Sequence, residues 1–258
     1  MKYLLAIAAF LFSISSAHAE DVLFLGNSFT SGNSLAGMVA AIAESKGKSV
    51  AATAVTKGGQ DFAYHLKHSL GKPEATAKAW DFVVLQDHSL GATHARKLDD
   101  FLKNGEQLVD RVAEKSPSAK FVLYETWSYA ADHKDLKDKK EGPTKFTGSE
   151  QMLGEIQESY AALRDRLLTK SAARDIRVAP VGTAFARCLR EHPEIELYAK
   201  DRKHPSIEGT YLAALVIYAT LFNDSPLNAA PGKKVDPAVA KALQEAAEQT
   251  VTAEREGK

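Results

Sequence analysis

The stretch DVLFLGNSFTSGN, residues 21–33, decides the fold. Four apolar residues run directly into Gly26-Asn27-Ser28 and then into small, turn-forming residues. Such a pattern is typical of a buried strand that leads through a turn into a helix. By itself it leaves open whether Ser28 caps that helix or is a nucleophile at the end of the strand.

Short apolar segments alternate with longer helical patterns along the rest of the chain. The apolar runs predict strands at 22–25, 50–55, 82–85, 121–124 and 176–179. The periodic patterns predict helices near 33–46, 60–70, 97–114, 150–170, 206–222 and 236–253. This alternation is typical of α/β proteins, so we expect a three-layer α/β/α sandwich around a parallel sheet of about five strands.

The composition allows a substantial core and points to no charged macromolecular partner. The 258 residues are 45% hydrophobic, and 33 basic residues balance 33 acidic ones. Without an excess of positive charge, neither nucleic acid nor an anionic membrane is indicated as a partner. The single cysteine, Cys188, cannot form an internal disulfide, and we expect a buried, unreactive thiol there.

The first 19 residues have the pattern of a secretory signal peptide. A basic second residue precedes an apolar run, and the segment ends in Ala-His-Ala. We therefore expect cleavage before Glu20, export to the periplasm or out of the cell, and a single domain over 20–258. The apolar run is shorter than the roughly 20 residues of a membrane span, so we expect no membrane insertion.

A candidate general base lies far along the chain, in Asp201-Arg-Lys-His204-Pro205. Pro205 disfavours helical geometry at His204 and suits the first turn of the helix that follows. Such a turn can let the Asp201 carboxylate accept from one imidazole nitrogen while the other nitrogen faces outward. This is how a Ser-His-Asp triad orients its base, so the residues indicate a triad of Ser28, His204 and Asp201.

On these residues the sequence resembles the SGNH (GDSL-type) hydrolase superfamily of esterases and lipases. The resemblance rests on four landmarks in the expected order: Gly26-Asn27-Ser28, Gly58-Gly59, a polar turn after the third strand, and Asp201-x-x-His204. It is closest to a bacterial subgroup that also has a Leu-Gln pair at the end of the third strand and His-Pro-Ser after the aspartate. This chain has those residues at 85–86 and 204–206.

The resemblance implies a flavodoxin-like sheet and a cofactor-free hydrolase. It makes Ser28 the nucleophile, His204 the general base and Asp201 the acid that orients it. It also implies an oxyanion hole formed by the backbone N–H groups of Ser28 and Gly59, or of its neighbour Gly58. Glycine suits that second position because the main chain can approach the substrate closely.

The third block departs from the superfamily pattern. Its usual Gly-x-Asn-Asp supplies an asparagine to the oxyanion hole, whereas this chain has Gln86-Asp87-His88-Ser89. A glutamine amide can donate the same kind of hydrogen bond, so Gln86 is the first candidate, with Ser89 and His88 as alternatives. The first block also has Asn27 in place of the usual aspartate.

Two further side chains are candidates for the substrate pocket. His65 follows the glycine pair by less than two helical turns, and Trp127 follows the fourth predicted strand. The default interpretation of His65 is a solvated surface histidine, and the favoured interpretation of Trp127 is a core or rim aromatic. His65 and His68 share a helical face, but no third ligand has a recognisable spacing, so we expect no metal.

The favoured function is an exported serine esterase that hydrolyses small acyl esters, such as O-acetyl groups on a polysaccharide. One alternative is a lipase or thioesterase that acts on longer acyl chains, and another is a non-catalytic glycan-binding protein on the same fold. A third is a flavin-binding electron carrier, because the hydroxyl-rich segment 28–34 resembles a phosphate-binding loop.

Segment 129–150, rich in Lys and Asp, is expected to be a solvated loop, with a substrate lid as the alternative. The sequence does not indicate an oligomeric state.

Overall fold

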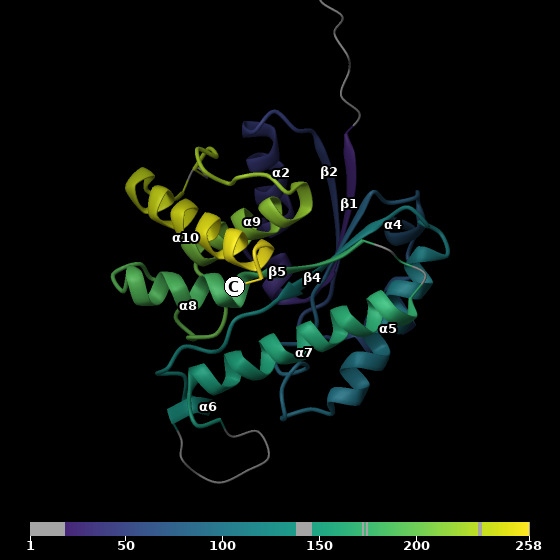
Figure 1. Cartoon of the computed structure of the whole chain (residues 1–258), viewed down its shortest axis with the longest axis horizontal. Coiled ribbons are helices and arrows are strands. Elements are labelled where there is room, and N and C mark those ends of the chain that lie inside the picture. Colours follow the sequence, from purple (N-terminus) through teal and green to yellow (C-terminus); the bar gives the residue numbers. More distant parts are fainter. Residues whose placement is uncertain (1–18, 138–145, 172, 174, 232–233, 258) are drawn as a thin grey trace, which may run out of the picture.

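The computed structural model describes residues 19–137, 146–171, 173, 175–231 and 234–257 (Figure 1). The expected signal peptide lies outside these residues except for its last alanine, so cleavage and export stay predictions. No helix in the described ranges is both long and apolar enough to cross a membrane.

Five parallel strands form the sheet, and they confirm all five predicted strands. They are β1 (Glu20–Gly26), β2 (Val50–Thr56), β3 (Phe82–Leu85), β4 (Lys120–Glu125) and β5 (Ile176–Pro180). Their spatial order is β2-β1-β3-β4-β5. The central strands are unbroken apolar runs because helices cover the sheet on both faces.

The predicted helices are present, with ends that differ by a few residues. The long helices are α2 (Leu35–Ser45), α5 (Leu98–Ala113), α7 (Ser149–Lys170), α8 (Val181–Glu191), α9 (Ile207–Phe222) and α10 (Pro237–Arg255). Short segments are α1 (Ser28–Ser31), η1 (Gly32–Ser34), α3 (Phe62–Tyr64), η2 (His65–Ser69), α4 (Pro73–Thr76) and α6 (Lys134–Lys137). Helix α8 was not predicted, because it begins directly after β5 with no intervening turn to mark the change of period.

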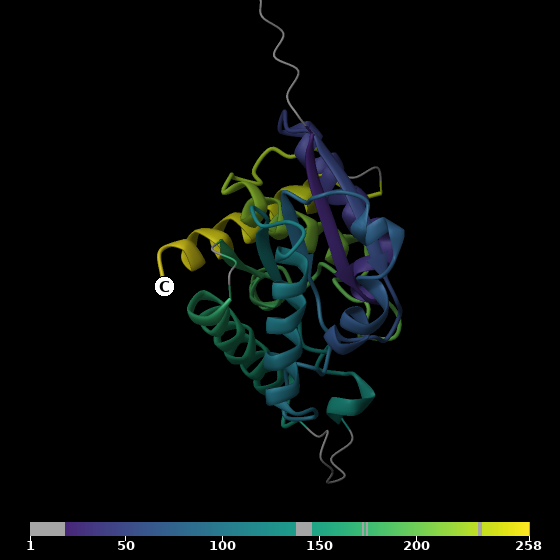
Figure 2. The ribbon, with the colours of Figure 1, turned by 90° about the vertical axis from the view of Figure 1, so that its right-hand side faces the viewer.

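The helices form one layer on each face of the sheet (Figures 1 and 2). One layer contains α2, α8, α9 and α10, and its core includes Cys188, which is buried and free as expected. The other contains α5 and α7. Helix α9 is apolar on all sides because it packs against the sheet, α2, α8 and α10. The structure is thus the expected three-layer α/β/α sandwich.

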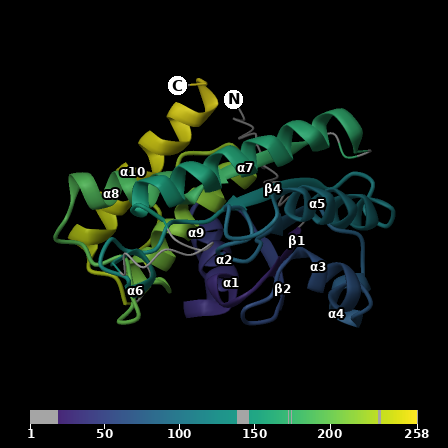
Figure 3. The same cartoon turned by 90° about the horizontal axis from the view of Figure 1, so that it is seen from below.

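The strand order creates a topological switch point at β1, whose neighbours are β2 on one side and β3 on the other. In open parallel sheets, ligands bind outside the carboxyl ends of the strands at this point, where the connecting loops diverge. Figure 3 shows α1 and α3 close to the labelled strands β1 and β2. Ser28 follows β1 directly, so the fold places it at the expected edge.

The described ends of segment 129–150 are anchored in the protein. Tyr129, His133 and Phe146 are buried, and the Phe146 ring packs against His94 with centroids 4.7 Å apart. The expectation of a fully solvated loop is therefore wrong for these ends, because aromatic side chains tie them to the core. The intervening residues 138–145 lie outside the described ranges.

Candidate active site

A continuous chain of hydrogen bonds joins the three residues of the predicted triad. Ser28 Oγ lies 2.9 Å from Nε2 of His204, although the two residues are 176 positions apart. On the other side of the imidazole, Nδ1 lies 2.5 Å from Oδ2 of Asp201. A carboxylate only accepts, so Nδ1 carries the proton, and Nε2 is left to accept from the serine hydroxyl. This is the arrangement that a general base needs to activate serine.

Asp201 is held as a carboxylate by the turn that it begins. Its Oδ1 accepts hydrogen bonds from the backbone N–H groups of Lys203 and His204, at 3.1 and 2.9 Å. Burial alone would raise the pKa of Asp201, but the hydrogen bonds from His204 and from these amides outweigh it and lower the pKa to about 2. Asp201 therefore remains ionised wherever His204 can act as a base.

A tight loop presents His204 toward Ser28. Tyr198 and Pro205 form an isolated antiparallel bridge, and the amide of Ala199 donates to the carbonyl of His204 at 2.8 Å. Between them Arg202 adopts a left-handed conformation, with φ of 59°. The loop thereby reverses the chain within a few residues and brings His204, beside its closing bridge, against the Asp201 carboxylate.

Trp127 is a core residue that supports this loop. The tryptophan is fully buried, and its ring stacks between Phe29 and Phe185 at centroid distances of 4.6 and 4.3 Å. Its Nε1 donates to the carbonyl of Lys203, and Phe29 in turn contacts the edge of the His204 ring. The prediction that Trp127 lines the substrate pocket is therefore wrong, because the stack takes both of its faces.

Asn27 joins the three loops that converge at the nucleophile. Its Nδ2 donates to the carbonyl of Gln60 in the loop after β2, at 2.9 Å, and to the carbonyl of Asp87 after β3, at 3.2 Å. Its Oδ1 accepts from the amide of Phe29 and so caps α1. An aspartate could make only the last of these bonds, which explains the asparagine at this position.

Gln86 is also committed to the nucleophile turn. It is fully buried, and its Oε1 accepts hydrogen bonds from the backbone N–H of Asn27 and from the Thr30 hydroxyl, each at 2.9 Å. Its Nε2 donates to the carbonyl of Asp87. The prediction that Gln86 supplies an oxyanion donor is therefore wrong, since its side chain is fully buried beneath the turn and its amide is bonded within the protein. The packing is close, because a Cβ at Gly26 would lie 2.7 Å from Gln86 Oε1.

Asn33, in the opening stretch of sequence, links the nucleophile to the base. Its Nδ2 lies 3.0 Å from the carbonyl of Ser206 and 2.8 Å from the hydroxyl of Thr210, at the start of α9. Asn33 has a φ of 48°, which asparagine tolerates better than most residues. This role was not predicted, although an asparagine between glycine and serine is a signal for such a turn.

Two backbone amides are candidates for the predicted oxyanion hole. Ser28 is the first residue of α1, where an amide has no acceptor within the helix. Gly58 and Gly59 form an exposed turn after β2, next to the Gln60 carbonyl that Asn27 holds. Gly59 has a φ of 70°, and its amide forms no hydrogen bond with the described backbone.

His88 and Ser89 differ sharply in their availability. Ser89 is buried and bonded to the Tyr129 hydroxyl at 2.9 Å. Half-buried His88 accepts from the Leu90 amide at Nδ1, so the proton of the neutral ring lies on Nε2. Burial, assisted by the positive charges of Arg96 and Lys203, lowers the pKa of His88 to about 4. His88 is thus a neutral donor whose tautomer is fixed by the backbone.

His65 does not line an open pocket. It is fully buried, its Nδ1 bonds to Ser69 Oγ at 2.8 Å, and burial lowers its pKa to about 4. The prediction of a pocket position is wrong because η2 turns this side chain inward. His68 on the same segment is exposed and packs against Tyr64. Across the described ranges, no three His, Cys, Asp or Glu side chains gather as metal ligands.

The fold and this geometry can be compared with known proteins. No protein-family model matches the chain, and no curated protein matches it. A solved DUF4886 family protein from Bacteroides uniformis is 20% identical, with a TM-score of 0.72 over 91% of this chain and 95% of that one. A protein assigned as a GDSL-like lipase, from Parabacteroides merdae, is 17% identical, with a TM-score of 0.59 over 79% of this chain and 96% of that one. An acetyl xylan esterase is 17% identical, with a TM-score of 0.56 over 77% of this chain and 98% of that one.

The chain has the SGNH/GDSL-hydrolase fold. The similarity covers most of each matched chain, so the whole sandwich is shared and not only one βα unit. The resemblance seen in the sequence is confirmed at the level of this fold. Within the SGNH/GDSL-hydrolase fold, the roles of individual residues in this chain rest on their own geometry.

We predict that Asn27→Asp lowers the free energy of unfolding and loosens the three loops that meet at Ser28. The carboxylate would lose both donor bonds and would place an oxygen against the carbonyls of Gln60 and Asp87. We expect a loss of about 1–3 kcal/mol in the free energy of unfolding, measured by urea denaturation. Asn228→Asp, the same change at an exposed left-handed position, is the control. Equal stability of the two variants would show that Asn27 does not hold the loops.

A second prediction concerns Asp87, which is buried at the end of β3 and accepts from the Phe62 amide at 2.6 Å. Burial raises its pKa to about 7, above the ordinary value of 3.8. The fold therefore favours the protonated form, and this contribution to stability is lost as the pH rises toward 7. Relative to Asp87→Asn, the free energy of unfolding should fall between roughly pH 4 and 7, by at most about 1.4 kcal/mol per pH unit.

Urea denaturation of both proteins at several pH values between 4 and 8 measures this difference. Buried Glu125, whose pKa burial also raises to about 7, is common to both proteins and cancels. Asp99→Asn, at an exposed position in the first turn of α5, is the matched control. Parallel pH profiles for the wild type and Asp87→Asn would contradict the prediction.

Proposed function

We propose that the protein is a serine esterase that hydrolyses small acyl esters. The observation that carries the proposal is the hydrogen-bonded series Ser28–His204–Asp201 at the topological switch point of the sheet. The proposed export to the periplasm or the exterior rests on the signal-like first 19 residues.

The reaction follows from the proton positions in the series. The Ser28 oxygen attacks the ester carbonyl while Nε2 of His204 accepts the hydroxyl proton. The imidazolium is stabilised by Asp201 and gives this proton to the departing alcohol oxygen as the C–O bond breaks. Water then attacks the acyl-serine and loses a proton to Nε2. The imidazolium returns this proton to the Ser28 oxygen as the C–O bond to serine breaks, which releases the carboxylic acid and restores the Ser28 hydroxyl.

The carbonyl oxygen of the ester becomes negatively charged when Ser28 attacks, and hydrogen-bond donors must stabilise this charge. We assign this role to three groups. The amides of Ser28 and Gly59 are two of them. The third is the Nε2–H of His88, in place of Gln86, because His88 keeps a fixed donor on a ring that stays neutral. A neutral donor stabilises the oxyanion in the transition state, and it binds the carboxylate product less tightly than a positively charged donor would.

A small acyl group is favoured over a long chain. The catalytic side chains lie at an open edge, where Asp201 and His204 are about half and one-third exposed, at 51% and 37%. One protein of the same fold is an acetyl xylan esterase, which supports an O-acetyl group on a carbohydrate as the substrate. Another is assigned as a GDSL-like lipase, so hydrolysis of longer acyl esters is the second candidate.

Substitution of the triad tests the proposal. Ser28→Ala and His204→Ala should each lower kcat on p-nitrophenyl acetate by at least about 10³-fold, with unchanged circular dichroism. Asp201→Asn should cost less than His204→Ala, because the imidazole is misoriented but present. Ser31→Ala, at an exposed serine of the same helix, is the control. Full activity in Ser28→Ala would overturn the proposal, and rates on acetate, butyrate and octanoate esters would separate an esterase from a lipase.

A separate substitution tests the oxyanion donor. His88→Ala should lower kcat by about 10²–10³-fold with little change in KM, since the bond forms mainly in the transition state. His88→Asn restores an N–H donor and should recover part of the loss. His68→Ala controls for removal of an exposed imidazole. An unchanged kcat in His88→Ala would remove His88 from the oxyanion hole.

A further inference from the structure

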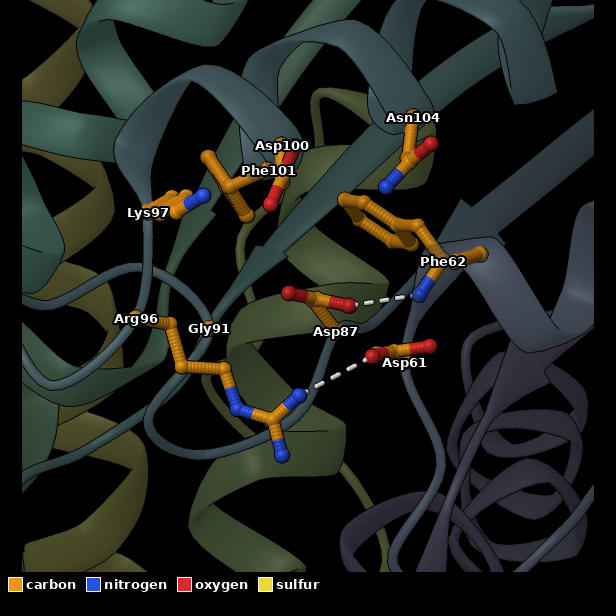
Figure 4. A pocket seen from close by; sticks show the side chains of 10 residues that line it. Asp61, Phe62, Asp87, Gly91, Arg96, Lys97, Asp100, Phe101 and Asn104 are labelled. Carbon is orange, nitrogen blue, oxygen red and sulfur yellow. Dashed lines mark hydrogen bonds and ion pairs between the residues drawn. The ribbon is translucent and has the colours of Figure 1, made fainter.

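A cavity lies beside the loops that follow β2 and β3, between α3 and the beginning of α5 (Figure 4). Its volume is about 320 Å³, and neither Ser28 nor His204 lines it. The polar lining comes from Asp61, Asp87, Arg96, Lys97, Asp100 and Asn104. This volume is at the lower end of the range of about 300–1,000 Å³ for small-molecule sites, which is enough for one small ring.

The cavity is coupled to the nucleophile turn through Asp87. The backbone carbonyl of Asp87 accepts from Asn27, next to Ser28, while its side chain extends to the cavity. Asp61 enters the cavity from the other side, two residues after Gly59 of the proposed oxyanion hole. A group bound there would therefore lie just behind the loops that hold the reacting ester.

The inner wall of the cavity carries a buried carboxyl group, that of Asp87. Asp87 is 3% exposed, and its Oδ1 accepts from the Phe62 amide. The other carboxyl oxygen, Oδ2, turns away from that bond toward the side of Lys97, and no other drawn side chain is bonded to it (Figure 4). A Cβ at Gly91 would lie 1.9 Å from Oδ2, so the glycine lets the Asp87 carboxyl group pack closely against the main chain. A buried carboxyl oxygen facing a cavity favours a ligand that offers a hydrogen bond.

The charges of the cavity nearly cancel. Arg96 pairs with Asp61 at 3.1 Å across one side, and Lys97 and Asp100 are an opposite pair of charges in the same lining. Burial raises the pKa of Asp87 to about 7, so near neutral pH this carboxyl is present both as a donor and as an acceptor. A cation would meet Arg96 and Lys97, and an anion would meet three carboxyl groups. The lining therefore suits a neutral ligand with many hydroxyl groups.

An apolar surface completes the lining. Phe62 and Phe101 stack with centroids 5.5 Å apart and an interplanar angle of 25°, and both line the cavity. Aromatic carbon beside carboxylate, amide and guanidinium groups matches a sugar ring, which has C–H surface as well as hydroxyl groups. We propose that this cavity is a carbohydrate subsite that binds one neutral sugar ring of the substrate beside the catalytic loops. The assignment deepens the proposed function and rests on it for the ester that the sugar carries.

Activity on two acetate esters tests the subsite. The ratio of kcat/KM on an acetylated methyl β-D-xyloside to kcat/KM on p-nitrophenyl acetate compares a sugar ester with one that has no sugar. This ratio should fall at least tenfold in Asp100→Ala and in Asn104→Ala. Asp99→Ala, one residue away in the first turn of α5 and outside the lining, should keep the wild-type ratio. Equal ratios in all of these proteins would overturn the subsite.

Binding of unesterified probes separates this proposal from the proposed function. The methyl glycosides of xylose, glucose and N-acetylglucosamine are titrated into the protein while the NMR signals of its backbone amides are recorded. At least one glycoside should shift the amide signals of residues 61–62 and 96–104 in a saturable way. The Asp100→Ala/Asn104→Ala variant should lose at least tenfold in affinity for it. Saturable sugar binding without esterase activity would overturn the proposed function alone. Choline and glucuronate serve as a cationic and an anionic probe of the same cavity. If none of the glycosides binds, or if choline or glucuronate binds more tightly than they do, the subsite proposal alone would be overturned.

Discussion

The side-chain amide of Asn27 is the interaction on which the arrangement of the site depends. Parallel strands bring their carboxyl ends to one edge, but the loops that leave them diverge, and nothing in the sheet fixes those loops relative to one another. Asn27 ties the loop after β1 to the loops after β2 and β3 through the carbonyls of Gln60 and Asp87. Gln86 holds the same turn by accepting hydrogen bonds from the backbone N–H of Asn27 and from the Thr30 hydroxyl. The positions of the nucleophile and of the glycine turn are therefore set by two buried amide side chains.

Much of the architecture could be predicted from the sequence because local pattern and tertiary environment agree. The five strands are buried on both faces and appear as short apolar runs, and α9 is apolar all round because it is enclosed. Helix α8 was missed where β5 passes into it without a turn. The pairing of Ser28 with His204 could be predicted because each residue type has a chemical reason to occur in its own turn.

Side-chain direction could not be predicted, and the errors follow from it. Gln86 has the chemistry of an oxyanion donor, yet its amide is used within the protein by acceptors and donors that only the folded chain brings near. Trp127 follows a strand at the active edge, but stacking with Phe29 and Phe185 keeps it in the core. His65 was misjudged for the same reason, because the direction of a short π-helical segment is not visible in residue spacing.

The stack of rings that ends at the His204 imidazole has a consequence for how the protein can change over evolutionary time. Phe185, Trp127 and Phe29 form a row of rings that reaches from α8 through the core to the edge of His204. Close-packed interiors transmit small displacements, so the volume of the Phe185 side chain, in a helix away from Ser28, affects the position of the His204 ring. If the proposed function is right, substitution at these core positions is constrained by the geometry of the site as well as by folding, without any change at the surface.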